Sequence, residues 1–131
     1  MPRAVLVVLA VLAGCTALPL PREGAYHPSD AELGVTRIVH GSLILELGKT
    51  RLLVDPWFHS GFTTRQTEPL GITPEHLPDI AAVLVTHKHA GHFDADALAE
   101  IAKKTPRAIA PPLLAGALRD AGFADVTPLE W

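Results

Sequence analysis

The stretch "VLVTHKHAGHFD", residues 83–94, places three of the chain's seven histidines within six positions. An apolar, β-branched run precedes the histidines, and Asp94 at the end of the stretch is a residue type that begins helices. The stretch therefore predicts a strand, then a tight turn that carries His87, His89 and His92, and then a helix. The segments before and after residues 83–94 are described below relative to this unit.

The three imidazoles have the spacing of a metal site. His87 and His89 are separated by one residue, so both side chains point the same way in extended backbone. His92 lies across a tight turn, which Gly91 helps to form. Three neutral imidazoles at a strand end suit a first-row metal ion, above all zinc, and leave a fourth position for water. The alternative is three polar residues in an exposed loop.

Length, composition and charge exclude some classes of function. The chain has 131 residues, which is enough for one small domain, and it is 48% hydrophobic and 19% charged. The formal net charge is −3, and the basic residues form no block. This balance is typical of a globular protein and argues against a nucleic-acid partner.

The N-terminus has the organisation of an export signal. Residues 1–14 contain Arg3, an apolar run and then small residues, as a secretory signal peptide does. The run ends in "LAGC", which resembles the lipobox of bacterial lipoproteins, so a lipid on Cys15 is expected. This predicts a lipid-anchored protein of the bacterial cell envelope, facing the periplasm or the exterior. The alternatives are an uncleaved anchor or a chance cysteine.

The segment that follows reads as a tether. Residues 15–34 contain three prolines and no hydrophobic period, so they predict a linker between the anchor and the fold. His27 lies in this linker and is expected to be solvated. Cys15 is the only cysteine, which excludes an intrachain disulfide.

Upstream of the histidines, the pattern predicts three antiparallel strands at 35–39, 42–47 and 50–54. Gly48 and Lys49 form the turn between the second and third strands. In the second strand, one face carries only leucine and the other face is mixed, so at least one side is expected to be buried. Residues 56–80 are irregular apart from a helical turn that starts at Thr73 and Pro74.

Around and downstream of the histidines, strands and helices alternate. Residues 81–86 predict an apolar strand covered on both faces, and residues 94–104 predict a helix capped by Asp94. A strand at "RAIAP", a second helix from Pro112 to a C-terminal Gly122, and a strand at "DVTPLEW" follow. The order indicates an α/β or α+β fold, with a mixed sheet and helices on one face.

At this point a family resemblance is specific. "THKHAGHFD" resembles the Thr-His-x-His-x-Asp-His motif of the metallo-β-lactamase superfamily. "RIVHGSLILELGKTRLLVDPWF", "ITPEHLPDIAAVLVTHKH" and "VTPLEW" are similar to its ascorbate-6-phosphate lactonase-like and N-acylphosphatidylethanolamine phospholipase D-like branch. The resemblance covers residues 35–131. It implies the N-terminal half of an αββα sandwich and metal-dependent hydrolysis of an ester, lactone or phosphodiester.

The resemblance also implies roles for individual residues. His87, His89 and His92 match the ligands of the family's first metal ion. Asp55 matches a residue that supports the metal-binding loop from behind the ligands. His40 matches the histidine of a "GHAS"-like turn, for which packing or support of a ligand is expected.

Two departures from the family pattern matter. Gly91 stands where the family has an aspartate that binds a second metal ion and orients the attacking water. Asp94 is a candidate replacement, although capping the following helix is its simpler role. The family's later ligands are expected from a second half of the fold, and no histidine follows His92. A single zinc ion on three histidines therefore fits better than a two-metal site.

These departures leave three hypotheses for function. The chain is a hydrolase-family lipoprotein that acts on a small-molecule or lipid substrate and is incomplete at Trp131. Alternatively, it is a zinc-binding or interaction module without catalysis, or a non-functional remnant. A half-sandwich would expose one apolar sheet face, so a second half-domain or self-association is expected to cover that face.

Overall fold

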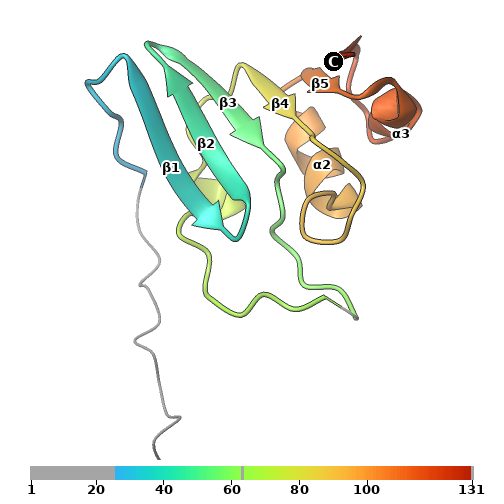
Figure 1. Cartoon of the computed structure of the whole chain (residues 1–131), viewed down its shortest axis with the longest axis horizontal. Helices are drawn as coiled ribbons and strands as arrows, with labels where there is room; N and C mark the ends of the chain where they lie inside the picture. Colours follow the sequence, from blue (N-terminus) through green and yellow to red (C-terminus); the bar gives the residue numbers. More distant parts are fainter. Residues whose placement is uncertain (1–25, 63, 131) are drawn as a thin grey trace, which may run out of the picture.

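The computed structural model describes residues 26–62 and 64–130, which form one six-stranded sheet with helices on one side (Figure 1). The strands are β1 (Leu33–Val39), β2 (Ser42–Leu47), β3 (Thr50–Val54), β4 (Ala82–Leu84), β5 (Arg107–Ala110) and β6 (Asp125–Pro128). The helical segments are η2 (Pro74–His76), α2 (Ala95–Ala102), η3 (Pro112–Leu114) and α3 (Ala115–Asp120). The mixed α/β fold and the predicted order of elements are confirmed.

The strands lie in the sheet in the same order as in the chain. β1, β2 and β3 pair antiparallel through two hairpins, and β3, β4, β5 and β6 pair parallel. The change from antiparallel to parallel pairing occurs at β3. From that point each connection must return across the sheet, and α2 and the η3–α3 segment lie in two of these connections.

The helix boundaries follow the predicted capping residues. The side chain of Asp94 accepts a hydrogen bond from the backbone N–H of Ala97 at the start of α2, as an N-cap does. Gly122 has a φ of 106° after the end of α3, a conformation that favours glycine. Both caps are confirmed, while α2 itself is shorter than the predicted helix 94–104.

The core lies on the face of the sheet that the helices cover. Paired positions place Ile44, Leu53, Val83 and Ala108 in one row across four strands, and all four are fully buried. Helix residues pack onto this row. They include Ala97, Leu98, Ile101, Leu114 and Leu118. This single layer of helices shields only one face of the sheet from solvent.

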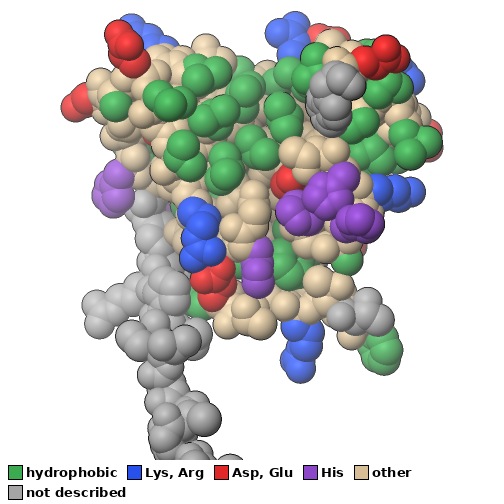
Figure 2. All heavy atoms as spheres, viewed as in Figure 1, with side chains coloured by type: hydrophobic (Ala, Val, Ile, Leu, Met, Phe, Trp, Pro, Cys, Tyr) green, Lys and Arg blue, Asp and Glu red, His purple; other side chains and the backbone are tan. Residues whose placement is uncertain are grey.

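The opposite face of the sheet, here called the open face, has no helix over it among the described residues. Its row Leu43, Val54, Leu84 and Ile109 is only half-buried, and Val35 on β1 is 62% exposed. Hydrophobic side chains spread over the side of the molecule that is turned toward the viewer in Figure 2. Uncovered apolar area of this extent is typical of a surface that another layer contacts.

The expectation that at least one side of β2 is buried is confirmed, and the open face corrects one other expectation. In β2 the mixed face is the buried one: Ser42, Ile44 and Glu46 are buried, whereas the all-leucine face is half-buried or exposed. The strand predicted at 81–86 is not covered on both faces, because Leu84 points to the open face. Periodicity identifies two faces of a strand, but it does not say which face the helices cover.

A buried ionic group explains why the mixed face of β2 can be buried. Glu46 is 2% exposed and accepts hydrogen bonds from the Tyr26 hydroxyl and the Ser29 backbone N–H. Arg51 Nε lies 2.6 Å from the Tyr26 oxygen and 3.4 Å from Glu46 Oε1. The hydrogen bond from Tyr26 is the main cause that lowers the pKa of Glu46. The buried carboxylate is therefore paired with three polar groups, as burial of a charge requires.

The same contacts locate part of the predicted tether. Tyr26 and Ser29 contact Glu46 of the sheet, and Leu33 and Gly34 already belong to β1. The predicted signal peptide 1–14 and Cys15 lie outside the described residues. Within the described ranges, each helix is too short or too polar to cross a lipid bilayer.

Candidate metal centre

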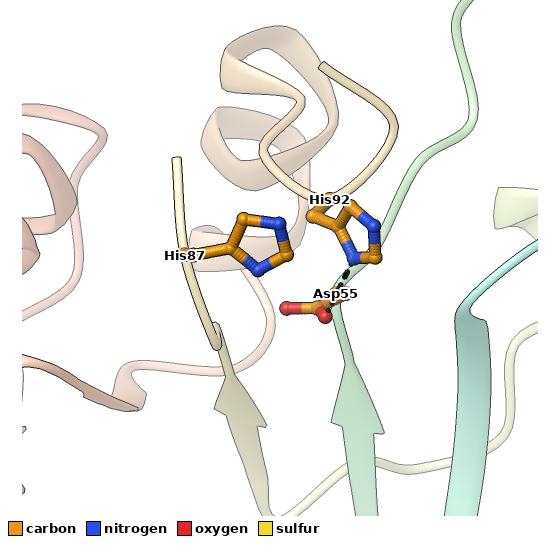
Figure 3. A group of neighbouring side chains, drawn as sticks. All are labelled: Asp55, His87 and His92. Atoms are coloured by element: carbon orange, nitrogen blue, oxygen red, sulfur yellow. Dashed lines mark hydrogen bonds and ion pairs between the residues drawn. The ribbon is translucent and has the colours of Figure 1, made fainter. Parts of the chain in front are cut away.

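The candidate site forms where β3 and β4 end side by side. Asp55 directly follows β3, and Thr86 and His87 lie two and three residues beyond the end of β4. The two strands are parallel neighbours, so their C-terminal ends meet at one edge of the sheet. The Asp55 backbone N–H donates to the Leu84 carbonyl at 2.9 Å, and its φ of 45° turns the chain. The Asp55 carboxylate lies beside His87 and His92 (Figure 3).

The Asp55 carboxylate accepts hydrogen bonds from the loop that carries the histidines. Oδ1 accepts from the Thr86 backbone N–H at 2.7 Å, and Oδ2 accepts from the Thr86 hydroxyl at 2.6 Å. Oδ2 also lies 2.9 Å from His92 Nδ1. Because a carboxylate only accepts, His92 carries its proton on Nδ1 and keeps the Nε2 lone pair free.

Thr86 fixes the second imidazole in the same way. Its oxygen lies 2.8 Å from His87 Nδ1. The hydroxyl hydrogen is already donated to Asp55, so the hydroxyl oxygen accepts from His87 Nδ1–H. His87 therefore also keeps the Nε2 lone pair free, and both histidines have the tautomer that a metal ligand needs.

These groups form a compact donor set. One ligand atom each from Asp55, His87 and His92 lies within 4.8 Å of the other two. The rings of His87 and His92 are 4.1 Å apart between centroids. Two imidazoles and a carboxylate whose ligand atoms lie within 4.8 Å of one another form a donor set that suits a zinc-type ion. Both Asp55 oxygens accept hydrogen bonds, so orienting His92 and Thr86 is the role that its contacts show.

His89 lies next to this cluster but outside it. Its ring meets the His87 ring edge-on, with centroids 4.9 Å apart, and its side chain is exposed. The loop closes through hydrogen bonds from the His92 and Phe93 backbone N–H groups to the His89 carbonyl. Gly91 has a φ of 95°, which confirms that the glycine serves the turn. The structure thus brings His87 and His92 together with Asp55, and places His89 at the rim.

The β1–β2 turn packs against the cluster from the side. A Cβ atom at Gly41 would lie 3.0 Å from His92 Cε1, so the hydrogen of glycine leaves room for the imidazole. His40 has a φ of 46°, its ring lies 5.0 Å from that of Trp57, and its backbone N–H donates to Glu68. The structure therefore places His40 in packing contact with Trp57, while its neighbour Gly41 makes the close approach to a candidate ligand.

The irregular segment after β3 carries His59, which is exposed and pairs with a carboxylate far along the chain. His59 Nδ1 lies 3.1 Å from Asp94 Oδ2, and Asp94 is 8% exposed. Asp94 also accepts from the backbone N–H groups of Phe58 and His59, so the irregular segment after β3 is tied to the start of α2. The pair is 35 residues apart in the chain, and no local pattern indicates it.

Thr86 and Gly41 are functional residues that reasoning from single residues missed. Thr86 stands in the quoted motif resemblance, but its role becomes visible only through its bonds to Asp55 and His87. Gly41 could be found only as a break between two predicted strands. Neither the threonine nor the glycine is a metal ligand here, so a search for ligand residue types finds neither of them.

Comparison with known proteins agrees with this architecture. The family model described as "Beta-lactamase superfamily domain" matches residues 50–130. Protein Rv0786c of Mycobacterium tuberculosis is 33% identical over 75 residues, which are 56% of this chain and 30% of that protein.

Solved structures share the fold of this half. Isothiocyanate hydrolase from Delia radicum gut bacteria is 24% identical with a TM-score of 0.57, over 73% of this chain and 41% of that one. A possible metal-dependent hydrolase from Veillonella parvula is 23% identical with a TM-score of 0.59, over 74% and 44%. CmlA, a diiron β-hydroxylase from Streptomyces venezuelae, is 28% identical with a TM-score of 0.59, over 79% and 22%. The chain thus spans less than half the length of each of these proteins.

Proposed function

We propose that this chain, which belongs to the β-lactamase superfamily, carries the first-metal half of a zinc-dependent hydrolase for an ester, lactone or phosphodiester. The observation that carries the proposal is the relay from Asp55 through Thr86 to His87, together with the bond from His92 to Asp55. These bonds leave Nε2 without a proton in two histidines whose ring centroids lie 4.1 Å apart. Structural histidines that need only a hydrogen bond do not require both tautomers to be fixed in this way.

In this proposal His87 and His92 hold the ion through Nε2, and His89 joins them from the rim. Bound zinc supplies a Lewis acid that lowers the pKa of a water molecule toward neutrality. The residues of the chain do the rest. Asp55 keeps the proton of His92 on Nδ1, Thr86 does the same for His87, and Gly41 leaves room for the His92 ring.

Support for a metal comes from both the donor set and a relative. Imidazole nitrogens suit zinc and also iron, and CmlA is described as a diiron enzyme. We propose zinc because the carboxylate that would accompany a second ion is absent at Gly91 and the Asp55 oxygens are taken. One ion per chain follows from this reasoning.

We also propose that a second sheet covers the open face in the active protein. The face is apolar along Leu43, Val54, Leu84 and Ile109, and the relatives named above are more than twice as long as the matched part. A second half-domain or another copy of the chain would bury this surface. The substrate would then lie over the histidines, between the two halves.

The N-terminal sequence supports a location for this reaction at the cell envelope. We propose lipid attachment at Cys15 and a position at the bacterial cell envelope, with residues 15–34 as the tether. A small-molecule or lipid substrate at the membrane surface would suit a tethered hydrolase.

A second candidate function is metal binding without catalysis. Gly91 favours it, because the aspartate expected at this position in the motif is missing and the glycine cannot orient an attacking water. This candidate shares the zinc site and differs only in turnover. The hydrolysis of p-nitrophenyl acetate and of bis-p-nitrophenyl phosphate by the zinc-loaded chain distinguishes the two candidates.

The test of the shared site is the zinc content of purified variants, measured by elemental mass spectrometry. We expect about one zinc ion per wild-type chain and loss of zinc in His87→Ala, His89→Ala and His92→Ala. The control is His76→Ala, because His76 is an exposed histidine bonded only to Thr73 in the described structure. Unchanged zinc in His89→Ala would remove His89 from the ligand set, and unchanged zinc in all three would reject the site.

A further inference from the structure

His59 and Asp94 form a second ordered histidine–carboxylate pair, next to the candidate metal centre. Asp94 Oδ1 accepts from Ala97 N–H at 3.0 Å, and Oδ2 accepts from the backbone N–H groups of Phe58 and His59 at 2.9 and 2.8 Å. These bonds hold the carboxylate rigidly. Because a carboxylate only accepts, His59 Nδ1 carries a proton, and in the neutral imidazole Nε2 is then an acceptor.

A pocket of about 250 Å³ lies beside this pair. One wall comes from the segment after β3 and includes Trp57, His59 and Thr64. The other wall comes from Ala90, Gly91 and the start of α2. The side chain of His59 is 47% exposed, so it is accessible from solvent. Gly91 belongs to the loop that carries His89 and His92, so the pocket adjoins the metal centre.

Gly91 also forms part of the pocket wall. A Cβ atom at position 91 would lie 3.7 Å from Cε3 of Trp57, in ordinary van der Waals contact with another lining residue. The glycine that departs from the expected motif thus adds no carboxylate to this part of the wall.

The charges around the pocket favour a cation that donates hydrogen bonds. Asp94 and Asp96 are the charged side chains among its described lining residues, which include neither lysine nor arginine. His59 offers a lone pair, and a primary ammonium group has three N–H donors and a positive charge to match it. A carboxylate or phosphate would meet two aspartates and an acceptor nitrogen.

We propose that His59, positioned by Asp94, binds a primary ammonium group of the substrate whose scissile bond lies over the histidine cluster. The second part of this statement, the place of the scissile bond, rests on the proposed function. The proposal narrows the substrate class of that same site to molecules with a primary ammonium group. Asp96 contributes charge at the rim, and Asp94 acts through His59 as a positioning residue. Recognition of the ammonium group needs no metal ion.

The test is a titration of the full chain with methylammonium chloride, followed through the imidazole ¹⁵N signals of His59 and, in every variant, through the backbone amide signals of Gly91 and Ala95, which line the pocket. Sodium acetate and ethylene glycol are the matched anionic and neutral probes. We expect saturable shifts of His59 Nε2 with methylammonium, and none with acetate. We expect at least tenfold weaker binding in His59→Ala and about threefold weaker binding in Asp96→Asn, as the loss of a bond and of a rim charge imply. His76→Ala should bind as the wild type does.

The outcomes separate this proposal from the proposed function. Absence of a saturable His59 shift with methylammonium overturns the ammonium site, and equal binding of ethylene glycol overturns the requirement for a cation. Zinc content measured in His59→Ala should equal that of the wild type. If the three metal-site histidines fail to bind zinc while methylammonium still binds, the metal proposal fails and the ammonium pocket stands. The full statement also requires that aminated esters be hydrolysed faster than their hydroxyl analogues, and that His59→Ala remove this preference.

Discussion

Gly41 lies directly against the imidazole of His92: a Cβ atom at position 41 would be 3.0 Å from His92 Cε1 and 3.5 Å from Nδ1. The turn between β1 and β2 therefore sets how far the His92 ring can move. The ring is confined between this turn and the Asp55 carboxylate, to which Nδ1 is bonded. A residue that binds nothing thus helps to place a candidate ligand.

Gly41→Ala should weaken zinc binding by about tenfold, because the added methyl group displaces His92 from its bond to Asp55. The measurement is competition with a chromophoric chelator. The control is Gly116→Ala, since a Cβ atom at Gly116 meets nothing within 4 Å and alanine is favoured in a helix. Equal affinity in the two variants would show that the turn does not constrain His92.

Asp55→Asn should weaken zinc binding by about 10- to 100-fold, the range found when a residue behind a metal ligand is changed. The amide can present an N–H group to His92 Nδ1, which would move the imidazole proton to Nε2 and block the ligand atom. The ¹⁵N shifts of His92 report the tautomer directly. A variant that keeps Nδ1 protonated and binds zinc normally would contradict the relay.

Gly91→Asp should destabilise the fold by about 1–3 kcal/mol without raising the number of zinc ions per chain. A φ of 95° is strained for any residue with a side chain, and the other ligands of a second ion are lacking among the described residues. The control is Gly48→Asp, because Gly48 has a φ of 57° that aspartate tolerates and its Cβ direction is empty. Urea unfolding and zinc content check the prediction. A second ion bound to Gly91→Asp would count against it.

Val35→Lys combined with Leu47→Lys should reduce self-association and dye binding at the open face. These residues are 62% and 48% exposed, so charging them should change the free energy of unfolding by only about 0.5 kcal/mol each. Sedimentation velocity and ANS fluorescence measure the effect. Phe62→Lys is the control, because Phe62 is fully exposed outside the sheet. An equal effect of the control would show that apolar exposure in general, rather than the open face, drives association.

The lowered pKa of Glu68 predicts how the stability of the fold depends on pH. Its bonds to the Arg37 guanidinium and the His40 N–H lower the pKa of Glu68 from 4.5 to about 2. Because the pKa is depressed in the folded state, this stabilisation is present above pH 4.5 and is lost as the pH falls toward 2. The loss of stability between pH 5 and pH 2.5 should be smaller in Glu68→Gln than in the wild type. Urea midpoints at the two pH values test this, and parallel losses would contradict it.

Much of the fold was predictable because it is encoded locally. The order of the elements along the chain, the cap at Asp94 and the turn at Gly122 depend on residues within a few positions of each other. The convergence of His87 and His92 follows from a strand end and a glycine turn. Local chemistry of this kind is readable without a structure.

The remaining features depend on partners far along the chain. Burial of Glu46 requires Tyr26 and Arg51, and no pattern within β2 shows that these residues neutralise it. The pairing of His59 with Asp94 joins segments 35 residues apart. Periodicity finds the faces of a strand, whereas the choice of the buried face depends on such distant contacts.

The meeting of the β3 and β4 ends at Asp55 has a thermodynamic consequence. Hydrogen bonds join Asp55 to residues 31 and 37 positions later, so the candidate site exists only when both strand ends are in place. An ion that binds there binds the native chain and not the unfolded one. At a concentration 100 times its dissociation constant it would add about 2.7 kcal/mol to the free energy of unfolding. Metal supply and folding of this half-domain would then be one linked equilibrium.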